Sequence, residues 1–280
     1  MEFILSRIMS SLTRISLIAF LSLFFFSTIY SQESQVDKEI DEAYRNAFTG
    51  NYEQAIPVLK KYSEQKGFDD SQHLSINIVL NWSYLATKKD SVDVDKVNSL
   101  SDAYFAKYGI SKNDTVKSKG EIFLLIMLGS INDKVCNYEK MVSYYSLAKK
   151  HYEEYQLTYN VPYSALLQLL AQGYINLNDY ELAFDTGEKA WEVNSKLFGE
   201  INEASLKILD ILYTCSIKNN IVEKSIEYVL KYAEISKELY GEKNTKYISS
   251  LVSLYQLYSK LGETQKALEI NLSVVELEKE

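Results

Sequence analysis

Proline, glycine, cysteine and histidine are all scarce in this chain, and each shortage removes a class of structure or site. Two prolines and ten glycines in 280 residues leave little room for turn-rich sheets or flexible linkers. The two cysteines, Cys136 and Cys215, and the two histidines, His73 and His151, share no ligand spacing, so no metal site is expected. Because the cysteines fall in different helical segments, we expect two small buried residues rather than a disulfide.

Motifs for catalysis are missing as well. The chain has no glycine-rich phosphate loop, no G-x-S-x-G turn and no H-E-x-x-H helix. Its formal net charge of −8 at pH 7 disfavours a nucleic-acid partner. We therefore expect a protein that is not an enzyme, needs no cofactor and does not bind nucleic acid.

The N-terminus carries the one long apolar run of the sequence. Arg7 and Arg14 precede an apolar stretch over residues 15–30 that closes on small residues, which is typical of a secretory signal peptide. The run is short for a transmembrane helix, and no cysteine near its end could accept a lipid. Residues 1–31 are thus predicted to be a signal peptide, giving a periplasmic or secreted protein without stable membrane insertion. An uncleaved N-terminal anchor is the alternative.

Amphipathic helices dominate the rest, and residues 164–199 show the pattern best. Two helices are predicted here, joined by a polar break at residues 176–179. Leu167, Leu170, Ala171 and Tyr174 form one apolar stripe at i, i+3, i+4 and i+7. The second stripe consists of Ala183, Phe184, Gly187, Ala190 and Trp191. The small residues in both stripes allow the two helices to approach closely.

This helix pair recurs at a fixed interval. Counting from Ala183 in steps of 42, one step back reaches Met141, and steps forward reach Ser225 and Ala267, each within a similar local string. The strings LFGE at 197–200 and LYGE at 239–242 are separated by the same step. A fixed period of this length indicates an array of repeated helix pairs.

The large and small residues at these positions resemble the tetratricopeptide repeat, and the 42-residue period with Gly-Glu after the second helix resembles its kinesin-light-chain type. The Asp-His-Pro that often follows Gly-Glu in that type is replaced by other residues at 201 and 243. The resemblance implies an all-α, right-handed α-solenoid of about six antiparallel helix hairpins within residues 32–280. The expected hairpins span 36–66, 71–108, 115–155, 164–199, 202–240 and 244–280.

In this family the first helix of each pair, helix A, lines the concave side, so its outward positions indicate what a groove could hold. In the last three hairpins we assign the candidate groove to Gln168, Gln172, Asn176, Lys207, Asp210, Thr214, Lys218, Gln256 and Lys260. These side chains are mostly neutral and polar. The Lys and Asn set with which some family members grip a C-terminal carboxylate is absent, which disfavours a receptor for chaperone tails. For any single residue of this set, a position on a solvated face that binds no ligand is at least as good an explanation as a role in the groove.

A second candidate surface lies in the last predicted helix, where Leu268, Leu272 and Val275 have no following repeat to cover them. This strip predicts a partner, a homodimer through the C-terminal repeat or a truncated reading frame. The resemblance implies an exported scaffold that binds proteins or peptides along its concave face. The alternative is an extracytoplasmic sensory input module of a bacterial signalling system. The sequence identifies neither the partner nor the pathway.

Overall fold

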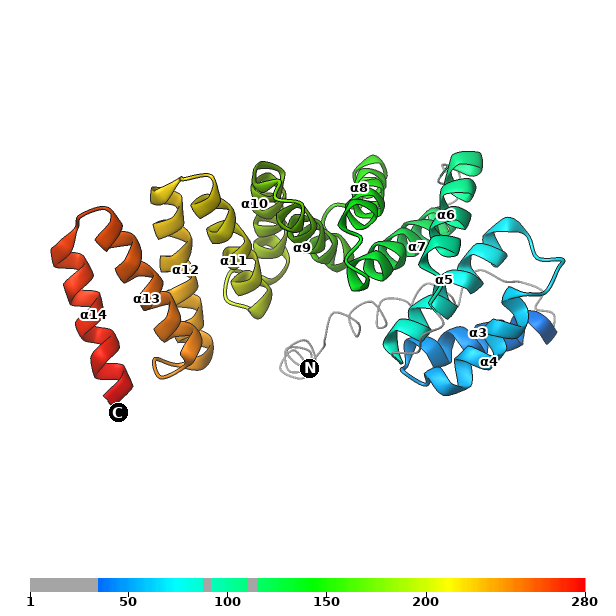
Figure 1. Cartoon of the computed structure of the whole chain (residues 1–280), viewed down its shortest axis with the longest axis horizontal. Coiled ribbons are helices and arrows are strands. Elements are labelled where there is room, and N and C mark those ends of the chain that lie inside the picture. Colours follow the sequence, from blue (N-terminus) through cyan, green and yellow to red (C-terminus); the bar gives the residue numbers. More distant parts are fainter. Residues whose placement is uncertain (1–34, 88–91, 110–114, 280) are drawn as a thin grey trace. The chain divides into compact units, whose positions relative to one another are not determined.

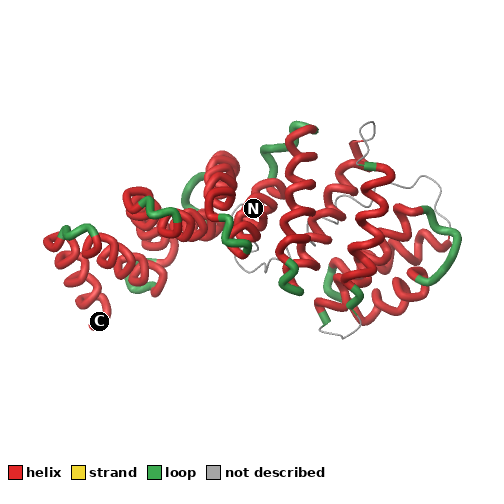
Figure 2. Tube along the Cα trace, turned by 45° about the horizontal axis from the view of Figure 1, so that its top comes forward, coloured by secondary structure: helices red, strands yellow, loops and turns green. Residues whose placement is uncertain are grey.

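The computed structural model describes residues 35–87, 92–109 and 115–279, and all regular structure in these ranges is α-helical (Figures 1 and 2). The helices are α3 (Gln35–Phe48), α4 (Tyr52–Ser63), α5 (Asp70–Ala86), α6 (Val94–Tyr108), α7 (Thr115–Lys134), α8 (Tyr138–Glu154), α9 (Val161–Asn176), α10 (Tyr180–Phe198), α11 (Glu203–Lys218), α12 (Val222–Tyr240), α13 (Thr245–Lys260) and α14 (Thr264–Lys279). The predicted signal peptide lies outside the described residues. Among those residues, no helix combines the length and apolar character needed to cross a bilayer.

Consecutive helices pair as the sequence predicts, with each odd-numbered helix as helix A and the following even-numbered one as helix B. The six predicted hairpins agree closely with the helix bounds. The largest differences are at the first, which stops at Ser63 instead of Lys66, and at the fourth, which begins at Val161 instead of Ser164. The chain divides into two compact units, the first ending at Tyr155 and the second beginning at Gln156. Within the second unit each helix packs on the next, and α9 also packs on α11.

The repeat register is confirmed by burial. Met141, Ala183, Ser225 and Ala267 are all buried, each near the start of its helix B. Gly187 shows why small residues are needed there, because an added Cβ would meet Leu212 Cδ2 of α11 at 3.0 Å. The small side chains therefore set the distance between a helix B and the helix A that follows it.

The turn from helix A to helix B has the same backbone conformation in most of the hairpins. In five hairpins a residue with positive φ, between 57° and 87°, follows helix A: Gly50, Cys136, Asn178, Asn220 and Gly262. The N–H of Asn178 donates to the carbonyl of Ile175 and the N–H of Asp179 to that of Tyr174, both at 2.9 Å. This is the Schellman arrangement, which satisfies the last carbonyls of a helix.

The same turn corrects the prediction for one cysteine. Cys215 is buried as expected, but Cys136 is exposed. Cys136 occupies the left-handed turn position (φ 58°), which projects from the packed faces of α7 and α8. The equivalent position in the next three repeats holds asparagine or glycine, and these residues tolerate left-handed backbone better.

The residue after each of these turns is the N-cap of helix B. The Asn137 side chain accepts a hydrogen bond from Lys140 N, and that of Asp179 from Leu182 N. Ile221 has nearly the same backbone angles (φ −95°, ψ 77°) as Asp179 (φ −88°, ψ 75°), but it provides no side-chain cap. The first turn of α12 therefore lacks one hydrogen bond that α8 and α10 possess.

Replacing Ile221 with aspartate is expected to stabilise the second unit by about 1 kcal/mol, because the carboxylate can accept from Lys224 N at a geometry already set by the backbone. Urea unfolding followed by circular dichroism measures the change. As the matched control, Asp179→Ala should lower stability by a similar amount. A loss of stability in Ile221→Asp would show that the half-exposed isoleucine contributes more by packing than a cap would.

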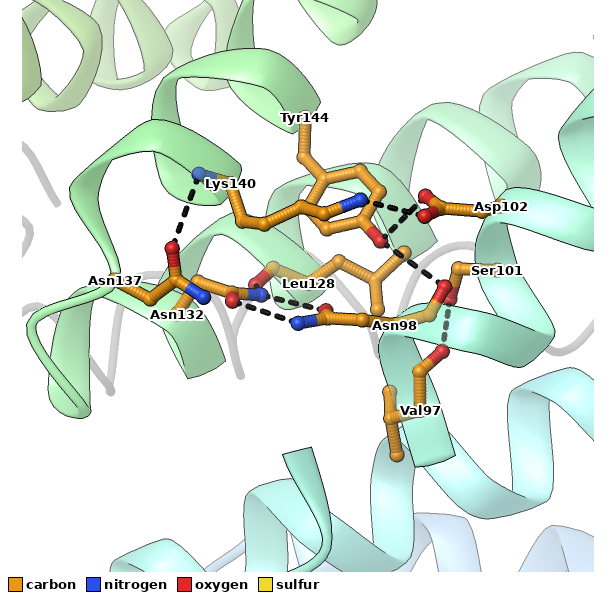
Figure 3. A network of polar contacts seen from close by, with 9 residues as sticks. All are labelled: Val97, Asn98, Ser101, Asp102, Leu128, Asn132, Asn137, Lys140 and Tyr144. Atoms are coloured by element: carbon orange, nitrogen blue, oxygen red, sulfur yellow. Dashed lines mark hydrogen bonds and ion pairs between the residues drawn. The ribbon is translucent and has the colours of Figure 1, made fainter. Parts of the chain in front are cut away.

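The first unit contains buried polar contacts between its helices (Figure 3). Asn98 of α6 and Asn132 of α7 are both buried, and each donates its amide N–H to the other's carbonyl oxygen, at 3.0 and 2.9 Å. Asn132 also donates to the backbone carbonyl of Leu128. One turn away, the Tyr144 hydroxyl donates to Asp102 at 3.1 Å. These bonds fix how α6, α7 and α8 lie against one another in this unit.

Candidate partner-binding groove

The predicted groove residues occupy one face of the helices A of the second unit. Gln168, Asp210 and Val252 are equivalent positions on α9, α11 and α13, because one full repeat separates each from the next. One turn later come Gln172, Thr214 and Gln256, and Asn176, Lys218 and Lys260 stand at the helix ends. Lys207 lies one turn before Asp210. Together these positions form a grid of three rows on three helices.

The grid is accessible to solvent. Gln168, Gln172, Asn176 and Thr214 are partly exposed, and the remaining predicted residues, Lys207, Asp210, Lys218, Gln256 and Lys260, are exposed. Two contacts order its α9 end: Gln172 Nε2 lies 3.3 Å from Asn176 Oδ1, and Gln168 Nε2 lies 3.3 Å from the carbonyl of Ser164. At the α11 end the Lys218 ammonium lies 5.7 Å from the centre of the Tyr180 ring.

Asp210 lies on α11, the middle of the three helices that carry the grid. Its side chain is exposed, yet desolvation by the surrounding protein raises the pKa of its carboxyl above the usual range. On α12, burial raises the pKa of the Tyr232 hydroxyl, and the negative charge of Asp210 raises it further. The protein around Asp210 therefore disfavours its charged form, although the side chain is accessible to water.

The C-terminal residues form a separate surface. Leu268, Leu272 and Val275 lie on α14, a helix B, and are exposed, whereas the groove lies on helices A. The sequence-predicted sites therefore fall into two groups that the structure does not bring together. On the same helix, Ala267 and Val274 are buried.

Sequence reasoning missed a third feature, an open cleft of about 390 Å³ between α10 and α12. It is lined by Asp185, Glu188, Lys189, Trp191, Glu192, Leu212, Glu227, Tyr228 and Lys231. The apolar stripe gave no reason to expect this cleft, because it placed Trp191 in the packed face of α10. The sequence held one signal for the cleft, the repeat interval. Asp185 and Glu227 are one repeat apart, so they occupy equivalent positions on consecutive helices B.

The charged groups of this cleft are largely paired with one another. Lys189 lies 2.7 Å from Glu192, Lys231 lies 3.3 Å from Glu227, and the Tyr228 hydroxyl donates to Glu188 at 2.7 Å. Hydrogen bonds from Lys189, then Lys196 and Tyr159, lower the pKa of Glu192 to about 2. These contacts therefore stabilise the ionised form of Glu192 at the edge of the cleft.

Comparisons with known proteins place the fold. No known protein-family model and no curated protein sequence matches the chain. Among solved structures, a kinesin light chain from Podospora anserina with nearly identical TPR-like repeats superposes with a TM-score of 0.56 at 14% identity, covering 75% of this chain and 97% of that one. BtubC (BKLC) from P. vanneervenii gives 0.56 at 18% identity, covering 88% and 92%. The apo form of RapI gives 0.56 at 15% identity, covering 87% and 66%.

These likenesses agree with the fold that the sequence predicts. At such low identities they establish the fold and nothing finer. The chain is an array of helix hairpins with the tetratricopeptide repeat fold.

Proposed function

We propose that this protein is a non-enzymatic scaffold that binds an extended or helical segment of another protein along the helix-A face of α9, α11 and α13. The observation that carries the proposal is the accessible polar grid on this face, formed by equivalent positions of three helices A. Amide and hydroxyl side chains can both donate and accept hydrogen bonds, so they suit the backbone N–H and C=O groups of a bound segment.

The balance of charge in the groove shapes the expected binding. The predicted grid carries three lysines and one aspartate among neutral side chains, and Lys218 rests over the Tyr180 ring. Few ion pairs with a ligand are available, so the affinity should depend only weakly on salt concentration. Recognition then rests mainly on hydrogen bonds and shape.

Changing Gln168, Gln172, Asp210 and Thr214 together to alanine should weaken partner binding at least about tenfold, or about 1.4 kcal/mol, while the helical content stays unchanged. A photo-crosslinking residue placed at Gln256 in cells of the natural host identifies what occupies the groove. The matched control carries the same crosslinker at Glu234, an exposed position on α12, a helix B.

A partner that crosslinks from Gln256, is absent with Glu234 and is reduced in the fourfold alanine variant supports the groove. Identical adducts from both positions, or none from Gln256, would contradict it. Purified partner then allows the affinity to be measured at two salt concentrations.

We also propose that the scaffold acts outside the cytoplasm, since Arg7 and Arg14 precede an apolar run that ends in small residues. The mature chain isolated from the host is expected to begin near Gln32. Intact-mass measurement of the protein from the periplasmic or culture fraction checks this. A mass that includes residues 15–30 would instead indicate an uncleaved anchor.

A further inference from the structure

The cleft between α10 and α12 combines buried, aromatic and charged side chains. Leu212 of α11 and Tyr228 of α12 line it and are buried, and Trp191 of α10 is half-buried. Its volume of about 390 Å³ falls at the lower end of the range of ligand pockets, which likewise combine apolar surface with a few polar groups. The cleft therefore has the size and lining of a site for a single side chain or a small molecule.

The lysines of the cleft already have carboxylate partners. Four ion pairs, with N–O distances from 2.7 to 3.3 Å, join Lys189 and Lys196 to Glu192, and Lys224 and Lys231 to Glu227. Of these lysines, only Lys189 and Lys231 line the cleft. Lys231 also lies over the Trp191 ring, 5.5 Å from its centre, as is favourable for an ammonium beside an aromatic face. An anionic ligand would therefore have to compete with both glutamates for these lysines.

Two carboxylates of the cleft can accept further hydrogen bonds, Asp185 and Glu188 on α10. They lie at i and i+3, so they share one side of the helix. Among the residues that the structure describes, Asp185 has no hydrogen-bond or ion-pair partner, and Glu188 accepts a single hydrogen bond, from the neutral hydroxyl of Tyr228 at 2.7 Å. A carboxylate can accept several hydrogen bonds on its two oxygens. The charge that faces the cleft without a counter-charge is therefore negative.

Tyr228 holds one of these carboxylates in place. Its buried ring lies 6.2 Å from the ring of Phe184, which itself packs against a buried cluster of α9, α10 and α11. Burial raises the pKa of the Tyr228 hydroxyl, and the hydrogen bond to Glu188 raises it further, so the hydroxyl stays protonated and continues to donate. Glu188 Oε1 is thus fixed, and Oε2 is left for a ligand. An acceptor that is already positioned loses less freedom on binding.

The geometry favours an organic cation, and a guanidinium more than an ammonium. In the described part of the chain no group of carboxylates, histidines or cysteines is placed to hold a metal ion. A guanidinium is planar and has five donors, so it can bond two carboxylates together and can also lie against an aromatic ring. The methylenes of an arginine side chain suit the apolar surface of Leu212 and Trp191.

We propose that the cleft between α10 and α12 binds an arginine side chain of a partner protein. Its guanidinium donates to Glu188 and Asp185, and its methylenes lie against Trp191 and Leu212. This site is separate from the groove on the helices A and does not depend on the function proposed for that groove. It gives the chain a second point of attachment, on its helices B.

Fluorine NMR of the full chain labelled with 5-fluorotryptophan tests the proposal, because the chain has two tryptophans and only Trp191 lines the cleft. Trp82, buried on α5 in the first unit, is the internal reference. The probe is the peptide acetyl-Gly-Arg-Gly-amide, added to millimolar concentration because one side chain makes few contacts. It should shift the Trp191 signal saturably and leave the Trp82 signal unchanged. Citrulline in place of arginine keeps the shape without the charge and should weaken binding at least about tenfold.

Asp185→Asn/Glu188→Gln removes both negative charges but keeps an acceptor for the Tyr228 hydroxyl, and it should weaken binding of the arginine peptide at least about tenfold. Glu181→Gln/Glu223→Gln is the matched control, because it removes the same charge from exposed residues of α10 and α12 that do not line the cleft. This control should bind normally. The variant with four alanines in the groove should also bind normally, so failure of the groove and failure of the cleft are distinguishable.

Three results would overturn the inference: no saturable shift of the Trp191 signal, equal binding of the citrulline peptide, or unchanged binding in Asp185→Asn/Glu188→Gln. Spermidine examines a free polyamine as the other occupant. If spermidine binds at least about tenfold tighter than the arginine peptide, the cleft is a site for a small cation and not for a partner's arginine.

Discussion

Replacing Gly129 with alanine is expected to destabilise the first unit by about 1–3 kcal/mol, although alanine is the better helix former. Gly129 lies in α7 against the ring of Tyr145 on α8, and an added Cβ would clash with atoms along one side of that ring. Tyr145 is fully buried, and its hydroxyl lies 3.0 Å from Ser130 Oγ, so the ring has no free direction in which to move. The methyl group can be accommodated only if α7 and α8 separate.

Gly120 provides the matched control, because it lies in the same helix and nothing lies within 4 Å of the point that an added Cβ would occupy. Gly120→Ala should therefore stabilise the unit by about 0.5–1 kcal/mol. Urea unfolding measures both changes, and hydrogen exchange of peptides from α7 and α8 locates them. Equal effects of the two substitutions would show that helix propensity, and not the contact with Tyr145, decides the outcome.

The repeat architecture could be predicted because its cause is periodic in the sequence. Met141, Ala183, Ser225 and Ala267 are buried for one shared reason, namely that a small side chain is needed where helix B meets its neighbours. A constraint that returns in every repeat is visible without a structure. The helix ends were predictable for the same reason, since the polar breaks and N-caps keep the same interval.

Features that depend on contacts between particular side chains, or on the backbone angle of one residue, could not be predicted from the sequence. Cys136 looked like a small core residue, and only the left-handed φ of its turn shows why it is exposed. The groove residues could be placed on one face by their spacing, but the desolvation of the Asp210 carboxyl depends on how the surrounding helices pack. The cleft between α10 and α12 likewise depends on pairings such as that of Tyr228 with Glu188.

Buried asparagines are the clearest case, because a polar residue in a helix is normally assigned to the surface. Asn77, Asn81, Asn98 and Asn132 are all buried in the first unit. Asn81 accepts a hydrogen bond from the backbone N–H of Asp93 at 2.7 Å and donates to the carbonyl of Asn77. Their burial is tolerated because their amides are hydrogen-bonded, a condition that no local sequence pattern reveals.

The second large effect is expected at the Asn98–Asn132 pair. Asn132→Leu should destabilise the first unit by about 3 kcal/mol, because it leaves the Asn98 amide buried without its partner and adds volume to a packed site. Asn98→Leu should cost a similar amount for the same reason. As a control, Ser83→Ala removes a buried hydroxyl that bonds only to the Val79 carbonyl of its own helix, and it should cost less than about 1 kcal/mol.

The double variant Asn98→Leu/Asn132→Leu distinguishes an interaction between the two amides from two separate packing defects. With both polar groups gone, no buried donor or acceptor of the pair is left unsatisfied, so its stability should exceed the additive expectation by about 1–2 kcal/mol. Urea unfolding of the unmodified protein, the two single variants and the double variant completes the double-mutant cycle. Hydrogen exchange in α6 and α7 reports whether the two helices stay packed together. Strict additivity would contradict the amide pair as the link between these helices. A coupling of the expected size would mean that the two buried asparagines hold α6 against α7 in one alignment, because a shifted alignment would leave both amides unpaired.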